Sequence, residues 1–296
     1  MALIMPKRLP DRNIRRVISQ HLSSGVLFRV PEEQRRIEGE MLVSRIVACY
    51  KWVAEEADIR INADLSVDLS KAKGKISDYD RNAIEAAVQA AEALGGKAVS
   101  LTFGTQKAKA SLKDVLSRGP EEGCWVNGEE ADNADSSVTA RALAAAIKKI
   151  EDVSLIICAE GASDTYARQI GPRIGAILNL PVITSVAKMT FVGETLQAVR
   201  KLDDCLQTVE VELPAVVAVL PEINSAPIPG LKAVMAAGKK PVTEYKSADL
   251  GVDLTPKTQV TAFKGYVMQR KNIILSGDVG ENVAALVAAL RKEGVL

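Results

Sequence analysis

The chain has 296 residues, 47% of them hydrophobic and 25% charged, which is enough for a sizeable core and roughly two domains, or for one large α/β unit with appendages. Its 38 basic and 37 acidic residues leave a formal net charge of +1, and only 4% of residues are aromatic. This balance argues against nucleic-acid binding through overall charge or through stacked bases. The single histidine, His21, nearly excludes histidine-based triads and histidine-rich metal sites.

Cysteine spacing and hydropathy narrow the class further. The four cysteines are Cys49, Cys124, Cys158 and Cys205, and no two of them form a CxxC pair, so neither a zinc site nor a redox dithiol is indicated. Reduced thiols in a cytoplasmic protein are the expectation. No apolar run approaches the ~20 residues that a membrane-spanning helix needs. We therefore expect neither a bound metal nor direct membrane insertion.

Residues 1–40 differ in composition from the rest and precede a second methionine, Met41. They lack the long apolar segment of a secretory signal. Their acids count against a mitochondrial presequence; they are Asp11, Glu32, Glu33, Glu38 and Glu40. We expect a flexible extension or an over-called start, with the functional chain beginning at Met41.

From Met41 onward, apolar strand patterns alternate with helical periodicity. The expected strands are 42–50, 98–103, 124–126 and 153–159. The expected helices are 80–94, 106–116, 136–150 and 165–178, the third of them capped by Ser136 or Ser137. Such alternation predicts a parallel sheet covered by helices on both faces.

The pattern changes after Pro181. Residues 182–192, 196–201 and 206–213 are predicted antiparallel strands, and 215–220 is a further buried strand. A long surface excursion is expected over 221–241, an irregular tail over 246–272 and a short last helix over 280–290. The predicted fold class is therefore α/β, with an antiparallel strand insertion and an extended C-terminal arm.

The loops that follow the parallel strands are the candidate binding sites, because ligands of open α/β sheets lie outside the carboxyl ends of the strands. These loops follow Tyr50, Phe103 and Ala159. The last of them reads Glu-Gly-Ala-Ser-Asp over 160–164 and leads into a predicted helix, whose free N–H groups and dipole attract phosphate. An ordinary strand-to-helix loop capped by Ser163 or Asp164 is the alternative interpretation.

Common catalytic motifs are missing from the sequence. It contains no GxxxxGK[ST] loop, no GxGxxG after a strand and no GxSxG elbow. Neighbouring acids such as Glu55-Glu56, Glu121-Glu122 and Asp203-Asp204 fall in predicted loops or near strand ends, where side chains are usually solvated. The residues alone thus predict a Rossmann-like nucleotide-binding protein without catalytic groups.

The segment 159–172, AEGASDTYARQIGP, resembles the nucleotide-binding loop of electron transfer flavoprotein β subunits, in which an Asp precedes a Gln-x-Gly. The corresponding residues are Asp164, Gln169 and Gly171. Further similar segments are ACYK, KISDYDRNAIEAA, KDVLSRGP, LPAVVAV, PIPGLKAVMAAGKKPV and ADLGVDL, so the likeness covers about 42–254. KDVLSRGP and SDTYARQ are most similar to the branch associated with nitrogen fixation and carnitine or acyl-CoA reduction. Cys205 departs from the family pattern, because Gly or an acid is usual there.

The resemblance implies a Rossmann-like sheet similar to that of adenine nucleotide alpha hydrolases, in an electron-carrying subunit that is not itself an enzyme. In such heterodimers an α subunit holds FAD, and the β subunit clamps that FAD and binds a second nucleotide. This nucleotide is AMP in the ordinary branch and a second FAD, which accepts hydride from NADH, in the electron-bifurcating branch. The implied partners are the α subunit and an acyl-CoA dehydrogenase or a quinone oxidoreductase-type acceptor.

The same resemblance implies an organisation of the chain. The extension 1–40 would precede a nucleotide-binding domain over 41–245, which includes a partner-recognition loop at about 221–241. The arm 246–296 would lie on the α subunit. Leu231 matches the anchor leucine of the recognition loop, and the branch-specific segment KDVLSRGP implies that Arg118 would approach the shared flavin.

Carried over position by position, the implied nucleotide contacts are Cys49, Ser77, Asp78, Tyr79, Asp80, Phe103, Gly161, Ala162, Ser163, Asp164, Thr165, Tyr166, Ala167, Arg168, Gln169, Ile170, Gly171 and Pro172. Backbone N–H groups of the loop would hold phosphate. Asp164 would fix the loop or accept from ribose or adenine, and Gln169 would bond the base or ribose from the first turn of its helix. Arg168, where a small or amide residue is common, would add positive charge.

Two other interpretations remain open from the residues. An ATP-binding protein of the stress-protein or hydrolase type can share this sheet topology. However, the Ser-Gly-Gly-x-Asp-Ser loop of an ATP pyrophosphatase is replaced by Cys49-Tyr50-Lys51-Trp52. A structural subunit without nucleotide would leave the N–H groups of the 160–164 loop in need of other partners.

Overall fold

The computed structural model describes residues 36–37, 40–41, 44–266 and 270–296. Most of the expected extension 1–40 lies outside these residues. In that region the structure describes β1 (Arg36–Ile37) and β2 (Glu40–Met41), which pair as antiparallel strands. The expectation that the functional chain begins at Met41 therefore stays a prediction.

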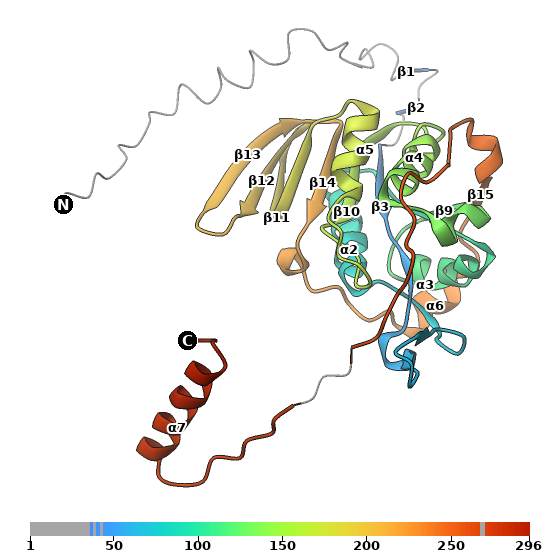
Figure 1. Ribbon diagram of the computed structural model, residues 1–296. Coiled ribbons are helices and arrows are strands. Elements are labelled where there is room, and N and C mark those ends of the chain that lie inside the picture. Colours follow the sequence, from blue (N-terminus) through green and yellow to red (C-terminus); the bar gives the residue numbers. More distant parts are fainter. Residues whose placement is uncertain (1–35, 38–39, 42–43, 267–269) are drawn as a thin grey trace.

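Nine strands of the described residues form one sheet in the order β13-β12-β11-β14-β10-β3-β8-β9-β15 (Figure 1). Neighbours from β11 to β15 along this order run parallel, whereas β11, β12 and β13 pair as antiparallel strands. The bounds are β3 (Arg45–Cys49), β8 (Lys97–Gly104), β9 (Glu122–Asn127), β10 (Val153–Ala159), β11 (Val182–Val192), β12 (Thr195–Lys201), β13 (Leu206–Glu212), β14 (Ala215–Val219) and β15 (Val242–Lys246). The predicted α/β fold class with its antiparallel insertion is confirmed.

Helices cover both faces of this sheet, as predicted. On one face lie α2 (Asp78–Leu94) and α3 (Ser111–Ser117), and on the other lie α4 (Ser136–Ile147) and α5 (Ile170–Leu178). Side chains of β3 alternate between the two faces, because successive residues of a strand point to opposite sides. Ile46 and Ala48 pack under α2, while Val47 and Cys49 pack under α4 and α5.

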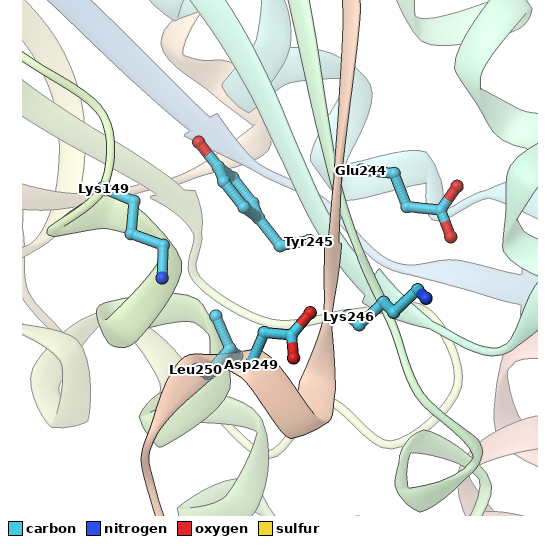
Figure 2. Close-up of a pocket in the computed structure, with 6 residues that line it drawn as sticks. All are labelled: Lys149, Glu244, Tyr245, Lys246, Asp249 and Leu250. Carbon is cyan, nitrogen blue, oxygen red and sulfur yellow. The ribbon is translucent and has the colours of Figure 1, made fainter.

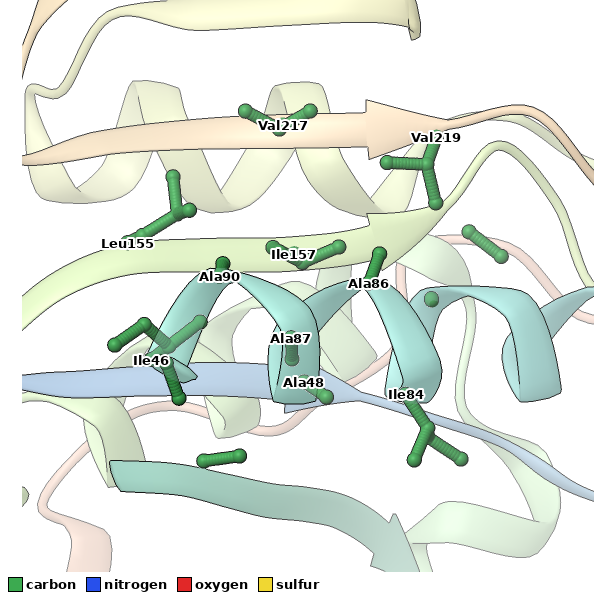
Figure 3. Close-up of a cluster of buried hydrophobic side chains, with 14 of the residues drawn as sticks. Ile46, Ala48, Ile84, Ala86, Ala87, Ala90, Leu155, Ile157, Val217 and Val219 are labelled. Atoms are coloured by element: carbon green, nitrogen blue, oxygen red, sulfur yellow. The ribbon is translucent and has the colours of Figure 1, made fainter. Parts of the chain in front are cut away.

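The α2 face shows how the sequence fixes this packing. Ala86, Ala87 and Ala90 of α2 lie on the central strands (Figure 3), and their small side chains let the helix approach the sheet closely. The strands fill the space with branched residues such as Leu155 and Ile157, which are fully buried. Burial of a side chain of this size contributes about 1.5–3 kcal/mol. Gly95, with φ of 63°, ends α2 in a left-handed conformation, as the Gly95-Gly96 pair predicts.

A small antiparallel region separates β3 from α2. In it β4 (Trp52–Ala54) pairs with β7 (Gly74–Ile76), and β5 (Arg60–Ile61) pairs with β6 (Val67–Asp68). The sequence analysis did not predict these short strands. Each has two or three residues, which is too short for a hydrophobic period to show.

Three expected helices begin or form differently in the structure. The helix expected from 165 begins at Ile170, so 160–169 is loop throughout. The cap of α4 is Asp135 and neither Ser136 nor Ser137, because the Asp135 carboxylate accepts from the N–H groups of Ser137 and Val138 at 2.9 and 2.8 Å. The helix expected over 106–116 is a 3₁₀ turn (Gln106–Ala110) followed by α3.

The region after 220 is also more ordered than predicted. The surface excursion contains α6 (Leu231–Ala237), and β15 extends the sheet at its edge. Both elements are short, and β15 reads Val-Thr-Glu-Tyr-Lys with mostly exposed side chains, so neither has a strong apolar pattern. The last helix, α7 (Val279–Lys292), is longer than predicted and stands away from the sheet (Figure 1). Among the described residues, no helix combines the length and apolar character needed to cross a membrane.

Asp135 also attaches the tail that leads to α7. Its second carboxylate oxygen accepts from the N–H groups of Lys257 and Thr258 at 2.8 and 3.2 Å. Arg141, in the second turn of α4, donates to the Thr255 carbonyl at 2.9 Å. The backbone hydrogen bonds lower the pKa of Asp135 to about 2, because they favour the charged carboxylate.

We expect Asp135→Ala to lower the free energy of unfolding by about 1 kcal/mol, since it removes a helix cap. The folded-state pKa lies below the ordinary value of about 3.9, so the charged form stabilises the fold above pH ~4 and this contribution is lost as the pH falls toward 2. Urea unfolding at pH 7 and at pH 3 measures the effect. Asp132→Ala, an exposed acid of the preceding turn, serves as the control. An equal loss at both pH values would contradict the role of the charge.

Candidate functional site

The order of the parallel strands reverses between β3 and β10. Along the chain β8 joins one side of β3, whereas β10 joins the other side. Cys49 and Cys158 are registered neighbours where the two strands end, and both side chains are buried. Ligands of open α/β sheets bind at such a reversal, so the loops after Cys49 and after Ala159 define the candidate site.

Ser77, at the start of α2, connects these two loops. Its N–H donates to the Lys51 carbonyl at 3.0 Å, and its hydroxyl accepts from the Ser163 N–H at 3.1 Å. An ion pair joins the Lys51 ammonium to the Asp164 carboxylate. The structure thus brings Cys49, Ser77, Ser163 and Asp164 to one edge of the sheet, although they come from three separate stretches of sequence.

The 160–169 loop carries many unused backbone donors. Its bonded N–H groups are those of Glu160, Ser163, Thr165 and Tyr166, which donate to Val219, Ser77, Asp164 and Ala162 respectively. In the part of the chain that the structure describes, no protein acceptor pairs with the N–H groups of Gly161, Ala162 and Asp164, or with those of 167–171 at the start of α5. The Ser163 hydroxyl is buried without a hydrogen bond of normal geometry. A loop with these donors at a helix N-terminus fits an anion such as phosphate.

Several predicted contacts are engaged with protein groups. Arg168 lies 3.5 Å from the Glu160 carboxylate and its guanidinium is 4.9 Å from the centre of the Tyr166 ring. Gln169 precedes α5 instead of lying in its first turn, and its amide oxygen accepts from Arg173 at 2.9 and 3.0 Å. The predicted position of Gln169 within the helix is therefore wrong.

Other predicted contacts differ in their surroundings. Asp78 is exposed and paired with Lys75 and Arg81, at 2.9 Å each. Tyr79 lies with its ring centre 5.1 Å from that of Tyr166, so it contacts the loop. Phe103, near the end of β8, packs beside the same hydrophobic cluster as Cys49. Thr165 and Ala167 are exposed within the loop, whereas Gly171 is buried and Pro172 is half-buried in the first turn of α5.

Asp80 is a buried acid of the site. One of its oxygens accepts the Lys51 N–H at 2.8 Å, and burial raises its pKa to about 7. A hydrogen bond with the neighbouring Cys158, together with burial, raises the pKa of the Cys49 thiol, which therefore stays protonated. Asp80 thus contacts the loop after β3 through the backbone of Lys51, a residue that the sequence analysis did not select. The position of Lys51 just after the first buried strand was the signal in the sequence that could have identified it as a site residue.

The predicted recognition segment exposes an apolar surface. Leu231 is the first residue of α6 and is 77% exposed, while Ile228 and Met235 are 94% and 70% exposed. Sequence reasoning missed Ile228 and Met235. The Lys240 ammonium fixes the end of the segment by donating to the carbonyls of Leu116, Gly119 and Pro120 at 2.6–3.0 Å. Arg118 is paired with Asp114 at 3.1 Å.

A hollow of about 490 Å³ lies beside β15, away from the 160–169 loop. It is lined by Lys149, Glu244, Tyr245, Lys246, Asp249 and Leu250 (Figure 2). None of the predicted nucleotide contacts is among these residues. We therefore assign the candidate site to the reversal between β3 and β10.

We expect Asp80→Asn to stabilise the protein above pH 7. Because burial raises the folded-state pKa, the native state holds a proton that the unfolded chain loses, so wild-type stability falls as the pH rises from ~4 to 7, by about 1.4 kcal/mol for each unit of pKa shift. The neutral amide removes this slope and its oxygen can still accept from Lys51. Unfolding measured between pH 4.5 and 8.5 tests this, with the exposed Asp78→Asn as control. A variant that keeps the wild-type slope would refute the assignment.

A comparison with known protein families agrees with the architecture. The family model described as the electron transfer flavoprotein domain matches residues 64–250, which is more than half of the chain. The match includes α2, the 160–169 loop, the antiparallel insertion and α6. Proteins of this family are electron carriers and generally bind FAD. The chain therefore belongs to the electron transfer flavoprotein family.

Proposed function

We propose that this chain is the β subunit of a heterodimeric electron transfer flavoprotein, from the branch associated with nitrogen fixation and carnitine or acyl-CoA reduction. In this role it clamps the FAD of an α subunit and holds a second adenine nucleotide, either AMP or FAD. Electrons pass through the heterodimer between a dehydrogenase or NADH and a redox acceptor. In this proposal the chain is an electron-carrying subunit and not itself an enzyme.

The unpaired donors of the 160–169 loop carry this proposal. A phosphate group would accept from the N–H groups of Gly161, Ala162 and Asp164, and from those at the start of α5, where the helix dipole adds attraction. AMP and FAD share this phosphate chemistry, and a bound FAD would add flavin redox chemistry at the site.

Exposed apolar residues support the assignment of partners. The α7 side chains Val279, Val283 and Leu286 are 81%, 56% and 48% exposed, and they lie on one face at helical spacing. An exposed apolar face of this kind marks a site of protein–protein interaction. We propose that the α subunit buries this face. The surface formed by Ile228, Leu231 and Met235 is assigned to an acyl-CoA dehydrogenase or a similar partner.

The direct test is to express the chain with its α subunit, purify the complex, and identify the nucleotides that acid releases. One FAD with one AMP would establish the single-flavin carrier, and two FAD would establish the bifurcating form. Release of ATP without an associated α subunit would support the ATP-binding alternative and reject the β-subunit assignment.

Gly161→Ala should weaken binding of the second nucleotide in the same complex by about tenfold, which corresponds to about 1.4 kcal/mol, and so lower its content in the purified complex. A Cβ atom at this position would lie 2.7 Å from Tyr166 Cδ2 and 3.1 Å from its Cα, so the loop must shift. Gly230→Ala adds a Cβ where no other atom lies within 4 Å and is the matched control. Chromatography of released nucleotides gives the measurement, and unchanged content would contradict the placement.

Leu231→Ala and Ile228→Ala should each slow electron transfer to the dehydrogenase by about tenfold, as expected for exposed anchors at a protein interface. The flavin spectrum should not change, because both residues lie outside the 160–169 loop. Leu206→Ala removes a leucine that is 70% exposed on the edge strand β13, and it controls for general loss of apolar surface. Wild-type rates in both variants would exclude the proposed recognition surface.

A further inference from the structure

Glu160 follows β10 directly and lies beside the loop that the proposed function assigns to a nucleotide. Its side chain is only 9% exposed, and its N–H donates to the Val219 carbonyl at 2.9 Å. A carboxylate this buried needs hydrogen-bond partners, because an unpaired buried charge is costly. The partners that it has are the basis of the inference.

Three side chains surround the Glu160 carboxylate. The Tyr166 hydroxyl donates to it at 2.7 Å, the Ser185 hydroxyl at 3.3 Å, and an Arg168 nitrogen lies 3.5 Å away. Two of these residues belong to the loop and the third belongs to β11. The bond to Glu160 raises the pKa of Tyr166, as expected for a phenol that donates to a carboxylate.

All three partners have left-handed backbone conformations. The φ angles are 46° at Tyr166, 58° at Arg168 and 59° at Ser185, a region that residues with a Cβ rarely occupy. Such conformations persist where surrounding contacts compensate for their cost. Here the shared contact is the Glu160 carboxylate. Ser185 also lies at the register shift of β11 between Ile183 and Val186, so the same contact joins the loop to the antiparallel insertion.

Tyr166 connects Glu160 with Gly161 and with Tyr79 of α2. Its ring lies against Gly161, where a Cβ would come within 2.7 Å, and its ring centre is 5.1 Å from that of Tyr79 on α2. From Glu160, the contacts therefore run through Tyr166 to the first turn of α2, and the unpaired N–H groups of Gly161, Ala162 and Asp164 lie between Glu160 and Tyr166 along the chain.

We propose that Glu160 is a positioning residue, which holds the 160–169 loop through Tyr166, Arg168 and Ser185 and so sets the affinity for the nucleotide without touching it. The inference rests on the proposed function for its ligand. In this role the Glu160 carboxylate acts as a hydrogen-bond acceptor, so the amide oxygen of a glutamine at the same position would retain most of the nucleotide affinity. A direct electrostatic role would give the opposite sign, because removing a negative charge beside a phosphate strengthens binding.

The test compares binding of AMP, and in a second series FAD, to full-length wild-type, Glu160→Ala, Glu160→Gln and Tyr166→Phe chains by equilibrium dialysis. We expect Glu160→Ala to weaken binding about tenfold or more, and Glu160→Gln to stay within about threefold of wild type. The double variant Glu160→Ala/Tyr166→Phe should bind the nucleotide no more weakly than the worse single variant, because the two substitutions remove the same Tyr166–Glu160 hydrogen bond. Glu129→Ala, at an exposed acid on the turn before α4, is the control.

A second readout does not depend on the nucleotide. Trypsin cleaves after Arg168, and cleavage in the ligand-free chain should be faster in Glu160→Ala and near the wild-type rate in Glu160→Gln. Unchanged cleavage together with unchanged affinity in Glu160→Ala, or additive effects in the double variant, would overturn the inference. A wild-type chain that binds neither nucleotide would reject the proposed function and the effect on affinity, while the cleavage rates would still decide whether Glu160 holds the loop.

Discussion

Parallel pairing of β3 with β10 is the constraint on which the candidate site depends. The two strands end together at Cys49 and Cys158, and the helices that follow them, α2 and α5, lie on opposite faces of the sheet. The chain must therefore diverge at this edge. Among the described residues, the N–H groups of Gly161, Ala162, Asp164 and 167–171 have no protein acceptor at this divergence, and these groups are what an anion can use.

The charges around this loop are arranged so that its acids are already engaged. Asp164 pairs with Lys51, and Glu160 accepts from Tyr166 and Ser185. Asp80 is buried and its pKa is raised to about 7, so near neutral pH it carries only part of a negative charge. A phosphate at the loop would thus meet backbone donors next to carboxylates that are paired or partly protonated. This explains how an acidic segment can serve an anionic ligand.

Two surfaces of the described residues expose more apolar side chains than is usual for a monomeric globular protein. Ile228, Leu231 and Met235 form an exposed apolar surface at α6, and α7 carries a second one at a distance from the sheet (Figure 1). Asp135 and Arg141 hold the tail onto α4 before it leaves the body of the protein. The fold therefore separates the candidate site, at the ends of β3 and β10, from the two exposed apolar surfaces, which is the arrangement that the proposed function requires.

Much of this organisation is encoded locally. The buried run Val-Ser-Leu-Ile-Ile-Cys-Ala and the alanine-rich period of α2 determine a covered parallel sheet, because each pattern can bury its apolar side chains in only one way. The segment 159–172 marked the loop, and the family match over 64–250 agrees with the resemblance at the level of the family. The predicted helix boundaries were wrong where contacts between side chains from distant segments determine them. The loop extends to Gln169, and the helix starts at Ile170. Glu160 accepts hydrogen bonds from Tyr166 and Ser185 in this loop region, and local helix propensity does not include such tertiary contacts.

The sequence by itself determined the α/β class, the position of the candidate loop and the absence of common catalytic motifs, since these follow from hydrophobic period and residue type. The tertiary structure decided which side chains serve that loop. Lys51 and Glu160 were not selected as site residues from the sequence, and they lie at the site because β3 and β10 are neighbours in space across more than 100 residues of chain. Long-range strand pairing is the physical reason, because no local pattern specifies which strands will be adjacent.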